Sequence, residues 1–516
     1  MTRFRLFLTA LVCTAPALAA VPTLAQLIDR TKAPNTAGEG IALSLEEQIG
    51  AGRGDWFTEE SASFIINRDP FRAIRRGRQL FQRKFTFTSG HGPVTGDGSG
   101  EIDRDLAIGA GLVDSCAGCH GRPRGSAGFG GLVVTRPDSR DAPHLFGLGL
   151  KEMLADELTQ TLRFIRQQAI AMATTRGKPV KRPLTAKGIS FGHIIGRPDG
   201  TADTSAVEGV DPDLRVRPFF AHGGTMSIRE FIVGALNDEM GLRVADPDLA
   251  AAQAGARIVT PSGMVLDGSI DPVKGPPAGA GELDPAAVDH LEFYLLNYFK
   301  PAVGDQTLEV ASGRGLLDRV GCTRCHVADL QIDRDRRVAD VDTAFDPVRG
   351  GLNRLFATAF PRYVESQDVA GLPSLKQPQL GSFVVRNVFS DFRRHDLGPN
   401  FHEREYDGTL RREFLTTPLW GVGSTSPYGH DGRSINLAEV ILRHGGAAQA
   451  ERDAFAALPA RRQQEVLAFL NSLILFPPDD TASNLDPGDR STPGYPQFGH
   501  GSIKLTVLFN NPLRIE

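Results

Sequence analysis

The pattern Cys-x-x-Cys-His occurs twice in this sequence, at residues 116–120 and at residues 322–326. The two copies contain four of the five cysteines of the chain, and the fifth, Cys13, lies near the N-terminus. In such a pattern the two thiols add to the vinyl groups of a porphyrin and the histidine binds its iron. The sequence therefore predicts two covalently attached c-type haems. The residues that hold them are Cys116, Cys119, His120, Cys322, Cys325 and His326.

Two other uses of paired cysteines explain the sequence less well. Structural zinc sites gather closely spaced ligands, whereas about two hundred residues separate these two cysteine pairs. A thioredoxin-like redox pair explains neither the histidine that follows each pair nor the duplication. Haem attachment is therefore the stronger interpretation.

Length and composition bound the class of protein. A chain of 516 residues is too long for one hydrophobic core and predicts two or three domains. Hydrophobic residues make up 41% and charged residues 23%, which is ordinary for a soluble globular protein. A net charge of −4 argues against a nucleic-acid partner.

The N-terminus is typical of a secretory signal peptide, which we place at residues 1–20. Arg3 and Arg5 precede an apolar stretch at 6–15, and small residues follow at 17–19. The apolar stretch is shorter than the ~20 residues that span a bilayer, and no later segment is apolar enough to do so. Because c-type haems are attached outside the inner membrane, signal and haem patterns together predict a periplasmic protein without a transmembrane segment in its mature chain.

The chain repeats itself around the two haem patterns. His222 follows His120 by 102 residues, and His430 follows His326 by 104 residues, each within a glycine-containing turn that leads into a predicted helix. Four pairs of segments match in the same order: 77–81 with 313–317, 143–149 with 417–423, 220–224 with 428–432, and 283–299 with 458–475.

The repeat predicts a mainly α fold of two cytochrome c-like haem domains, related by internal duplication and carrying long loops and insertions. We expect the N-terminal domain at 26–300 with an insertion at about 150–217, and the C-terminal domain at 301–476. The second half carries its own insertion between His326 and Thr416. Residues 477–516 are expected to form a proline-rich tail.

The sixth ligand of each iron decides whether a haem only transfers electrons or also binds small molecules. Aligning Ser227 with Asn436 places His444 of the second half opposite Ala235 of the first. We therefore expect His326 and His444 to bind the second iron and the His120 haem to be open. A solvated histidine at a helix end, beside two glycines, is the alternative for His444.

An open haem that cleaves peroxide needs a nearby group that moves protons. Glu239, just beyond Ala235, is the preferred acid and base, and His222 is a second candidate. The structural alternative for Glu239 is an ordinary helix-end carboxylate. The structural alternative for His222 is a residue that orients its turn. For His430 the structural role is favoured, and His144 could instead cap the open iron.

With these residues the chain resembles the bacterial di-haem cytochrome c peroxidase superfamily, in particular its large di-haem oxidoreductases of the thiol oxidoreductase type. The resemblance lies in residues 145–149, 229–231, 239–241, 395–399, 417–421, 430–433 and 444–446. It implies a high-potential electron-transfer haem in the C-terminal half and a peroxidatic haem in the N-terminal half. Glu239 matches the distal carboxylate of that superfamily, and His444 stands where its peroxidases carry Met and its maturation enzymes carry Tyr.

Three departures from the superfamily bear on mechanism. Histidine in place of methionine at 444 should lower the potential of the second haem, because a thioether stabilises ferrous iron better than imidazole does. Phe219 and Phe220 stand about where the superfamily often has a tryptophan between the haems. No histidine lies between His120 and His144 to match the gating histidine of the peroxidases.

The leading hypothesis is a periplasmic di-haem peroxidase that reduces hydrogen peroxide at the His120 haem. Its electrons would come from a small periplasmic cytochrome or a cupredoxin, and a calcium ion between the domains is a further expected cofactor. One alternative is a di-haem oxidase or oxygenase of an organic or protein substrate, whose pocket the 150–217 insertion would build. The other is a cytochrome that only transfers electrons.

Overall fold

The computed structural model describes residues 45–85, 113–121, 126–128, 130, 132–133, 138, 140–276, 281–298, 302–341, 343–346, 352–355, 360–367, 371–405 and 407–475. The predicted signal peptide, Cys13, His91, His500 and the predicted tail from 477 lie outside these ranges. Within them, no helix combines the length and the apolar character that crossing a membrane requires.

The first half of the chain is built on short helices. They are α1 (Leu45–Ile49), α2 (Ala62–Arg68), α3 (Pro70–Gln82), α5 (Cys116–His120), α7 (Ile228–Asp238), α8 (Pro247–Gln253) and α9 (Pro285–Asn297). Side-chain caps fix where several of them begin. Asp69 accepts from the backbone N–H of Arg72 and precedes Pro70, a residue suited to the first helical position.

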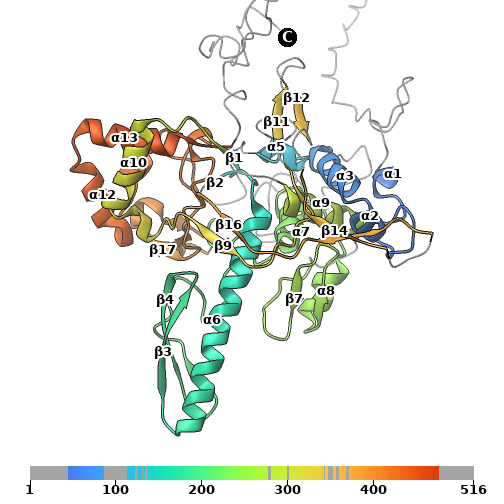
Figure 1. Cartoon of the computed structure of the whole chain (residues 1–516), viewed down its shortest axis with the longest axis horizontal. Helices are drawn as coiled ribbons and strands as arrows, with labels where there is room; N and C mark the ends of the chain where they lie inside the picture. The colour runs from blue at the N-terminus through green and yellow to red at the C-terminus, as the bar shows by residue number, and fades with distance from the viewer. Residues whose placement is uncertain are drawn as a thin grey trace, which may run out of the picture. The chain divides into compact units, whose positions relative to one another are not determined.

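The second half repeats this pattern with fewer helices. They are α10 (Leu308–Arg319), α11 (Leu437–Arg443), α12 (Gln449–Ala456) and α13 (Ala460–Asn471), with 3-10 turns η3 (Cys322–Arg324), η4 (Pro399–Phe401), η5 (Val422–Ser424) and η6 (Gly446–Ala448). The helices α10, α12 and α13 gather in one region of the molecule (Figure 1).

The same pair of crossing helices occurs once in each half. In the first half, helix α3 packs on α9. In the second half, helix α10 packs on α13. A Cβ atom at Gly77 would collide with the backbone oxygen of His290, and one at Gly313 would collide with that of Glu465. Glycine is therefore required at the crossing point of both pairs, and the internal repeat seen in the sequence corresponds to a repeated packing.

The buried apolar side chains form three cores. The first holds residues of the first half, including Phe81, Leu291 and Tyr294, and another holds residues of α10 to α13, including Phe469. The remaining core joins the insertions of the two halves and includes Trp420. The division of the chain into two haem domains at 301 stays a prediction.

The insertion of the first half forms a long helix with a small sheet beside it. Helix α6 (Leu148–Arg176) runs along β3 (Val180–Ala186) and β4 (Ile189–Gly196), and β5 (Ala202–Asp203) completes an antiparallel sheet of order β3-β4-β5 (Figure 1). The base of α6 packs on β9 (Leu330–Ile332) of the second half. This insertion therefore connects the two halves of the chain. An open pocket lies beside His222, and no described residue of the insertion lines it.

The prediction of a mainly α fold is wrong, because the chain also forms many small antiparallel sheets. Most of the strands pair within the loops and insertions, where short alternating segments can form hairpins without a large core. The strands not yet named are β1 (Leu132–Val133), β2 (Arg140–Asp141), β6 (Arg257–Val259), β7 (Val265–Asp267), β8 (Ala302–Val303), β10 (Ala339–Asp340), β11 (Thr343–Asp346), β12 (Leu352–Leu355), β13 (Phe360–Pro361), β14 (Tyr363–Ser366), β15 (Leu375–Pro378), β16 (Phe383–Val385), β17 (Arg394–Asp396), β18 (Glu403–Arg404), β19 (Leu410–Arg411), β20 (Glu413–Leu415) and β21 (Leu473–Ile474). The fold is mixed α/β.

Candidate haem sites

The first Cys-x-x-Cys-His pattern is the short helix α5 itself. Ser115 caps it by accepting a hydrogen bond from the backbone N–H of Gly118 at 3.1 Å. His120, at its end, has its Nδ1 2.7 Å from the carbonyl oxygen of Pro143. A carbonyl can only accept, so Nδ1 carries the proton and the lone pair is on Nε2.

The second pattern occupies the tight turn η3. Gly321 has φ of 92° in the left-handed region, which allows the chain to turn sharply out of α10. The backbone N–H of His326 donates to Cys322 at 2.9 Å, and its Nδ1 lies 2.9 Å from the carbonyl oxygen of Phe389. His326 thus has the same tautomer as His120.

Both patterns fit a covalently bound haem. Burial lowers the pKa of His120 and of His326 to about 4, so both imidazoles are neutral with Nε2 available to iron. The four thiols form no disulfide. Burial raises the pKa of Cys116 to about 12 and of Cys119 and Cys322 to about 11, so these thiols are neutral when nothing is bound to them.

His444 ends helix α11, which begins at the cap Asn436. Its Nδ1 lies 2.7 Å from the carbonyl oxygen of Val440, so this imidazole too presents its Nε2 lone pair. Burial lowers its pKa, and the electrostatic influence of His444 in turn lowers that of His326. The two histidines therefore lie in one neighbourhood, with the same tautomer.

The corresponding helix of the first half begins in the same way but continues further. Ser227 caps α7 and Glu230 completes a capping box, as Asn436 caps α11 and Glu439 donates its N–H to it. At Ala235 the helix goes on for another turn, and the carbonyl of Ala235 accepts the N–H of Glu239 at 3.0 Å. This turn carries Glu239 in place of an imidazole.

Glu239 lies near the first haem pattern. Burial is the largest cause of the raised pKa of Cys119, and the negative charge of Glu239 raises it further. This places the carboxylate within electrostatic reach of the thiol that precedes His120. The role predicted for Glu239 stays a prediction.

His222 lies in a different setting, on the wall of an open pocket of about 420 Å³. The pocket is shared with the second half, whose residues Arg394, Asp396, Leu410, Arg411, Arg412 and Glu413 line the rest of it. Phe220, with φ of 58°, stacks on the imidazole of His222, the ring centroids being 6.1 Å apart. His222 therefore belongs to a polar pocket at the contact of the two halves.

Each glycine-containing turn is held by the opposite half. The backbone N–H of Leu415 donates to Ala221 at 2.8 Å, and that of Asp141 donates to His430 at 3.1 Å. The imidazole of His430 stacks on Phe414 with a centroid distance of 4.0 Å. These contacts agree with an orienting role for the His430 turn.

His144 contacts the second half through Trp420. Its Nε2 lies 3.1 Å from the carbonyl oxygen of Trp420, and the indole packs against Gly147. Nδ1 of His144 is buried without a hydrogen-bond partner among the described residues. In the sequence, Trp420 lies in a repeated segment and in one of the stretches that carry the family resemblance, but neither pattern predicts this contact.

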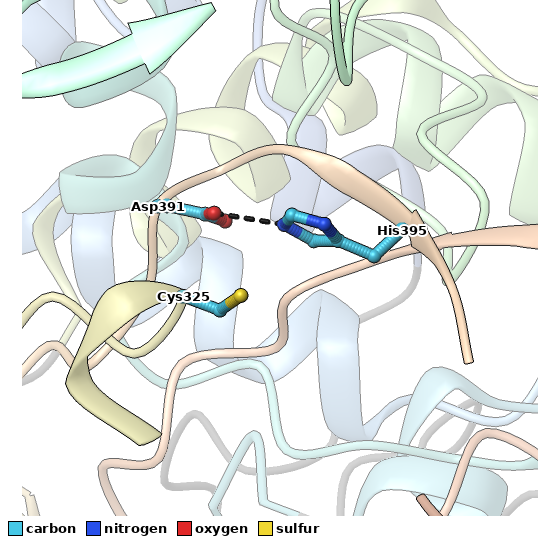
Figure 2. A group of neighbouring side chains, drawn as sticks. All are labelled: Cys325, Asp391 and His395. Carbon is cyan, nitrogen blue, oxygen red and sulfur yellow. Dashed lines mark hydrogen bonds and ion pairs between the residues drawn. The ribbon is translucent and has the colours of Figure 1, made fainter. Parts of the chain in front are cut away.

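A second feature missed from the sequence is the group formed by Cys325, Asp391 and His395, whose side chains converge in Figure 2. His395 Nε2 and Asp391 Oδ2 are 2.8 Å apart. Although burial opposes it, the contacts with Asp391 and Cys325 raise the pKa of His395 to about 9. The spacing of four residues between Asp391 and His395 was the available signal, but Cys325 joins them only through the fold.

Within the described residues this group is the one set of His, Cys, Asp and Glu side chains close enough to share a metal ion. It contains a single carboxylate, whereas calcium binds six to eight oxygen ligands. The predicted calcium ion stays a prediction.

Comparison with known proteins supports the haem assignment. Residues 357–473 match the family described as "Di-haem oxidoreductase, putative peroxidase". No curated protein matches the chain. A solved structure of Kuenenia stuttgartiensis hydrazine synthase under 20 bar xenon is similar at 14% identity, covering 82% of this chain and 94% of that chain, with a TM-score of 0.33. That likeness is too low to carry an argument, but the match to the di-haem oxidoreductase family over residues 357–473 confirms the resemblance predicted from the sequence.

Proposed function

We propose that the protein is a periplasmic di-haem peroxidase that reduces hydrogen peroxide at the haem held by Cys116, Cys119 and His120. Electrons from a small periplasmic cytochrome or cupredoxin would enter through the haem held by Cys322, Cys325 and His326. The family match supports an oxidoreductase with haem cofactors.

The difference between the ends of α7 and α11 carries this proposal. Where α11 ends, His444 offers a lone pair on Nε2 in the neighbourhood of His326. At the equivalent place α7 has Ala235, whose methyl group cannot bind iron. One haem site is thus supplied with two imidazoles and the other with one, which suits electron transfer in the first case and binding of a small oxidant in the second.

The haem supplies the redox chemistry, and the protein must supply protons. Glu239 is held at the end of α7 by its own backbone hydrogen bond to Ala235. A carboxylate in this position can accept a proton from bound peroxide and return it to the leaving oxygen. Pro143 keeps the His120 proton on Nδ1, which leaves Nε2 as the nitrogen that would bind the iron.

The test is steady-state reduction of hydrogen peroxide by the holo-protein with a reduced small cytochrome as donor. Glu239→Gln removes the proton-accepting group with little change in size, and we expect turnover to fall about a hundredfold or more. Asp238→Asn is the matched control, because it changes the neighbouring carboxylate of α7 and should leave turnover unchanged.

Two results would contradict the proposal. Full turnover in Glu239→Gln would remove this residue from the mechanism. An unmodified protein that holds both haems, accepts electrons from the donor and still fails to reduce peroxide would contradict the peroxidase itself.

A further inference from the structure

Each proximal histidine is held by a backbone carbonyl of its own half. Nδ1 of His120 donates to the carbonyl oxygen of Pro143 at 2.7 Å, and Nδ1 of His326 donates to that of Phe389 at 2.9 Å. In both sites the imidazole that would bind iron through Nε2 is thus connected to the backbone by its other nitrogen. The backbone at Pro143 and at Phe389 is therefore one hydrogen bond away from the iron ligand.

The backbone of the first half reaches the second half one residue beyond Pro143. Nε2 of His144 lies 3.1 Å from the carbonyl oxygen of Trp420. A carbonyl can only accept, so Nε2 carries the proton and donates it across the contact between the halves. Trp420 is buried, and this hydrogen bond connects its backbone to the turn that holds the first proximal histidine.

On the other side of this bond, the backbone leads to the second proximal histidine. The N–H of Leu419, the residue before Trp420, donates to the carbonyl oxygen of Val388 at 3.1 Å. Val388 precedes Phe389, whose carbonyl holds His326, and both residues are fully buried. An unbroken series of covalent bonds and four hydrogen bonds thus joins the two proximal histidines, and we call it the bonded path. Its residues, in order, are His120, Pro143, His144, Trp420, Leu419, Val388, Phe389 and His326.

The two turns that meet at this contact occupy equivalent positions of the internal repeat, where Gly147 corresponds to Gly421. Both glycines have φ in the left-handed region, at 75° and 78°. A Cβ atom at Gly147 would lie 2.9 Å from the indole of Trp420, and one at Gly421 would lie 3.4 Å from Nε2 of His144. The two copies of this turn therefore pack directly against each other, and the His144 hydrogen bond lies where they meet.

We propose that electrons pass between the two haems along the bonded path, with His144 as the positioning residue that connects the halves. Covalent and hydrogen bonds couple an electron donor to an acceptor better than a gap of equal length, because orbital overlap falls steeply through space. In this step the haem attached at Cys322 and Cys325 loses one electron and the haem attached at Cys116 and Cys119 gains it. No bond breaks and no proton moves. The proposal rests on the two haems of the proposed function but not on peroxide reduction.

The experiment measures how fast one electron, supplied by a photoreduced flavin, redistributes between the haems of the holo-protein without peroxide. A phase independent of protein concentration reports this transfer, and a Cys322→Ala/Cys325→Ala variant assigns the absorbance of the first haem. His144→Leu removes the N–H donor, whereas His144→Gln supplies an amide that can donate from nearly the position of Nε2. We expect transfer to slow severalfold in His144→Leu and to stay close to the unmodified rate in His144→Gln, with both midpoint potentials unchanged.

Lys187→Met is the matched control, because it breaks another contact between the halves. Nζ of Lys187 donates to the carbonyl oxygen of Gln331 at 2.5 Å and pairs with Glu157 at 2.7 Å. Lys187 lies outside the bonded path, so its substitution should leave the rate unchanged. Equal slowing in Lys187→Met and His144→Leu would overturn the proposal, because a looser contact between the halves would then explain both.

Three further outcomes would overturn the proposal. An unchanged rate in His144→Leu would show that electrons cross by another route. A slower rate that a shifted midpoint potential of the first haem explains in full would show that His144 acts on the driving force alone. Conversion of the first haem from low spin to high spin would identify His144 as an axial ligand. Transfer that depends on His144 in a protein unable to reduce peroxide would support the bonded path and contradict the peroxidase.

A second polar variant covers the case in which His144→Leu does not fold. The amide of asparagine is one carbon shorter than that of glutamine, so His144→Asn keeps a polar side chain but cannot reach the carbonyl of Trp420. We expect His144→Asn to transfer electrons severalfold more slowly than His144→Gln. Equal rates in these two variants would contradict a role for the hydrogen bond.

Discussion

Helices α7 and α11 begin alike and end differently. Each starts at a polar cap, Ser227 or Asn436, followed three residues later by a glutamate. Helix α11 then stops, and His444 turns its Nδ1 to the carbonyl of Val440. Helix α7 continues past Ala235 to Glu239. The proposed metal ligand, His444, and the proposed proton-transfer group, Glu239, thus differ by one side chain and one additional turn of the same kind of helix.

Removing one haem pattern at a time should produce the largest effect and separate the halves. Cys322→Ala/Cys325→Ala should lose one of two covalent haems and all turnover driven by the cytochrome donor, since the electron entry is gone. Cys116→Ala/Cys119→Ala should also lose one haem, together with peroxide reduction from any donor. Intact-protein mass and haem absorbance measure the loss. Donor-driven turnover that survives without the second haem would contradict the assigned direction of electron flow.

Exchanging the side chains of Ala235 in α7 and His444 after α11 should reverse the difference in ligands between the two haems. His444→Ala should convert the second haem from low spin to high spin, because its imidazole ligand is removed. Ala235→His should close the first haem and abolish peroxide reduction. Electron paramagnetic resonance of the ferric proteins reports both changes.

His402→Ala is the control for this exchange, since His402 is also a histidine of the second half but has its Nε2 2.8 Å from Asp396. It should leave both spin states unchanged. A second haem that stays low spin in His444→Ala would show that another residue supplies the ligand.

Glycine substitutions at the two helix crossings test whether both halves depend on the same packing. Gly77→Ala and Gly313→Ala place a methyl group against backbone, and each should lower the free energy of unfolding by at least about 1–3 kcal/mol. Gly315→Ala, in the same helix as Gly313, has open space around it and should be neutral or stabilising by about 0.5–1 kcal/mol. Denaturant unfolding followed by circular dichroism compares them. Equal stability of Gly313→Ala and Gly315→Ala would contradict the close approach.

Substitution of the helix-cap residues should give the smallest effect. It should also distinguish α7 from α11. Ser227 is fully buried and exchanges hydrogen bonds with Glu230, so Ser227→Ala should cost about 1–2 kcal/mol. Asn436 is exposed and caps through one hydrogen bond of 2.9 Å from Glu439, so Asn436→Ala should cost about 0.5–1 kcal/mol. The midpoints of denaturant unfolding measure both. A larger loss for Asn436→Ala would reverse the expected order.

Local sequence patterns predict those parts of the molecule that rest on local chemistry. The two haem patterns, the repeat and the cap residues of α7 and α11 are all visible as short motifs, because each acts within one turn or one helix. Most of the small strands were missed because segments of two to four residues show no reliable alternation, and pairs such as β17 with β20 join segments that lie apart in the sequence.

Sites assembled from distant residues could not be predicted in the same way. Cys325 meets His395 only after the chain folds back from residue 326 to residue 390. Such features depend on tertiary contacts, for which a single sequence offers no periodicity to read.

Electron paramagnetic resonance of the oxidised, unmodified holo-protein tests the central claim most directly, since it counts the irons of each spin state. The asymmetry between Ala235 and His444 predicts one high-spin and one low-spin ferric haem in equal amounts. Two low-spin haems would show that a strong ligand already occupies the first iron, and two high-spin haems would show that His444 does not bind the second.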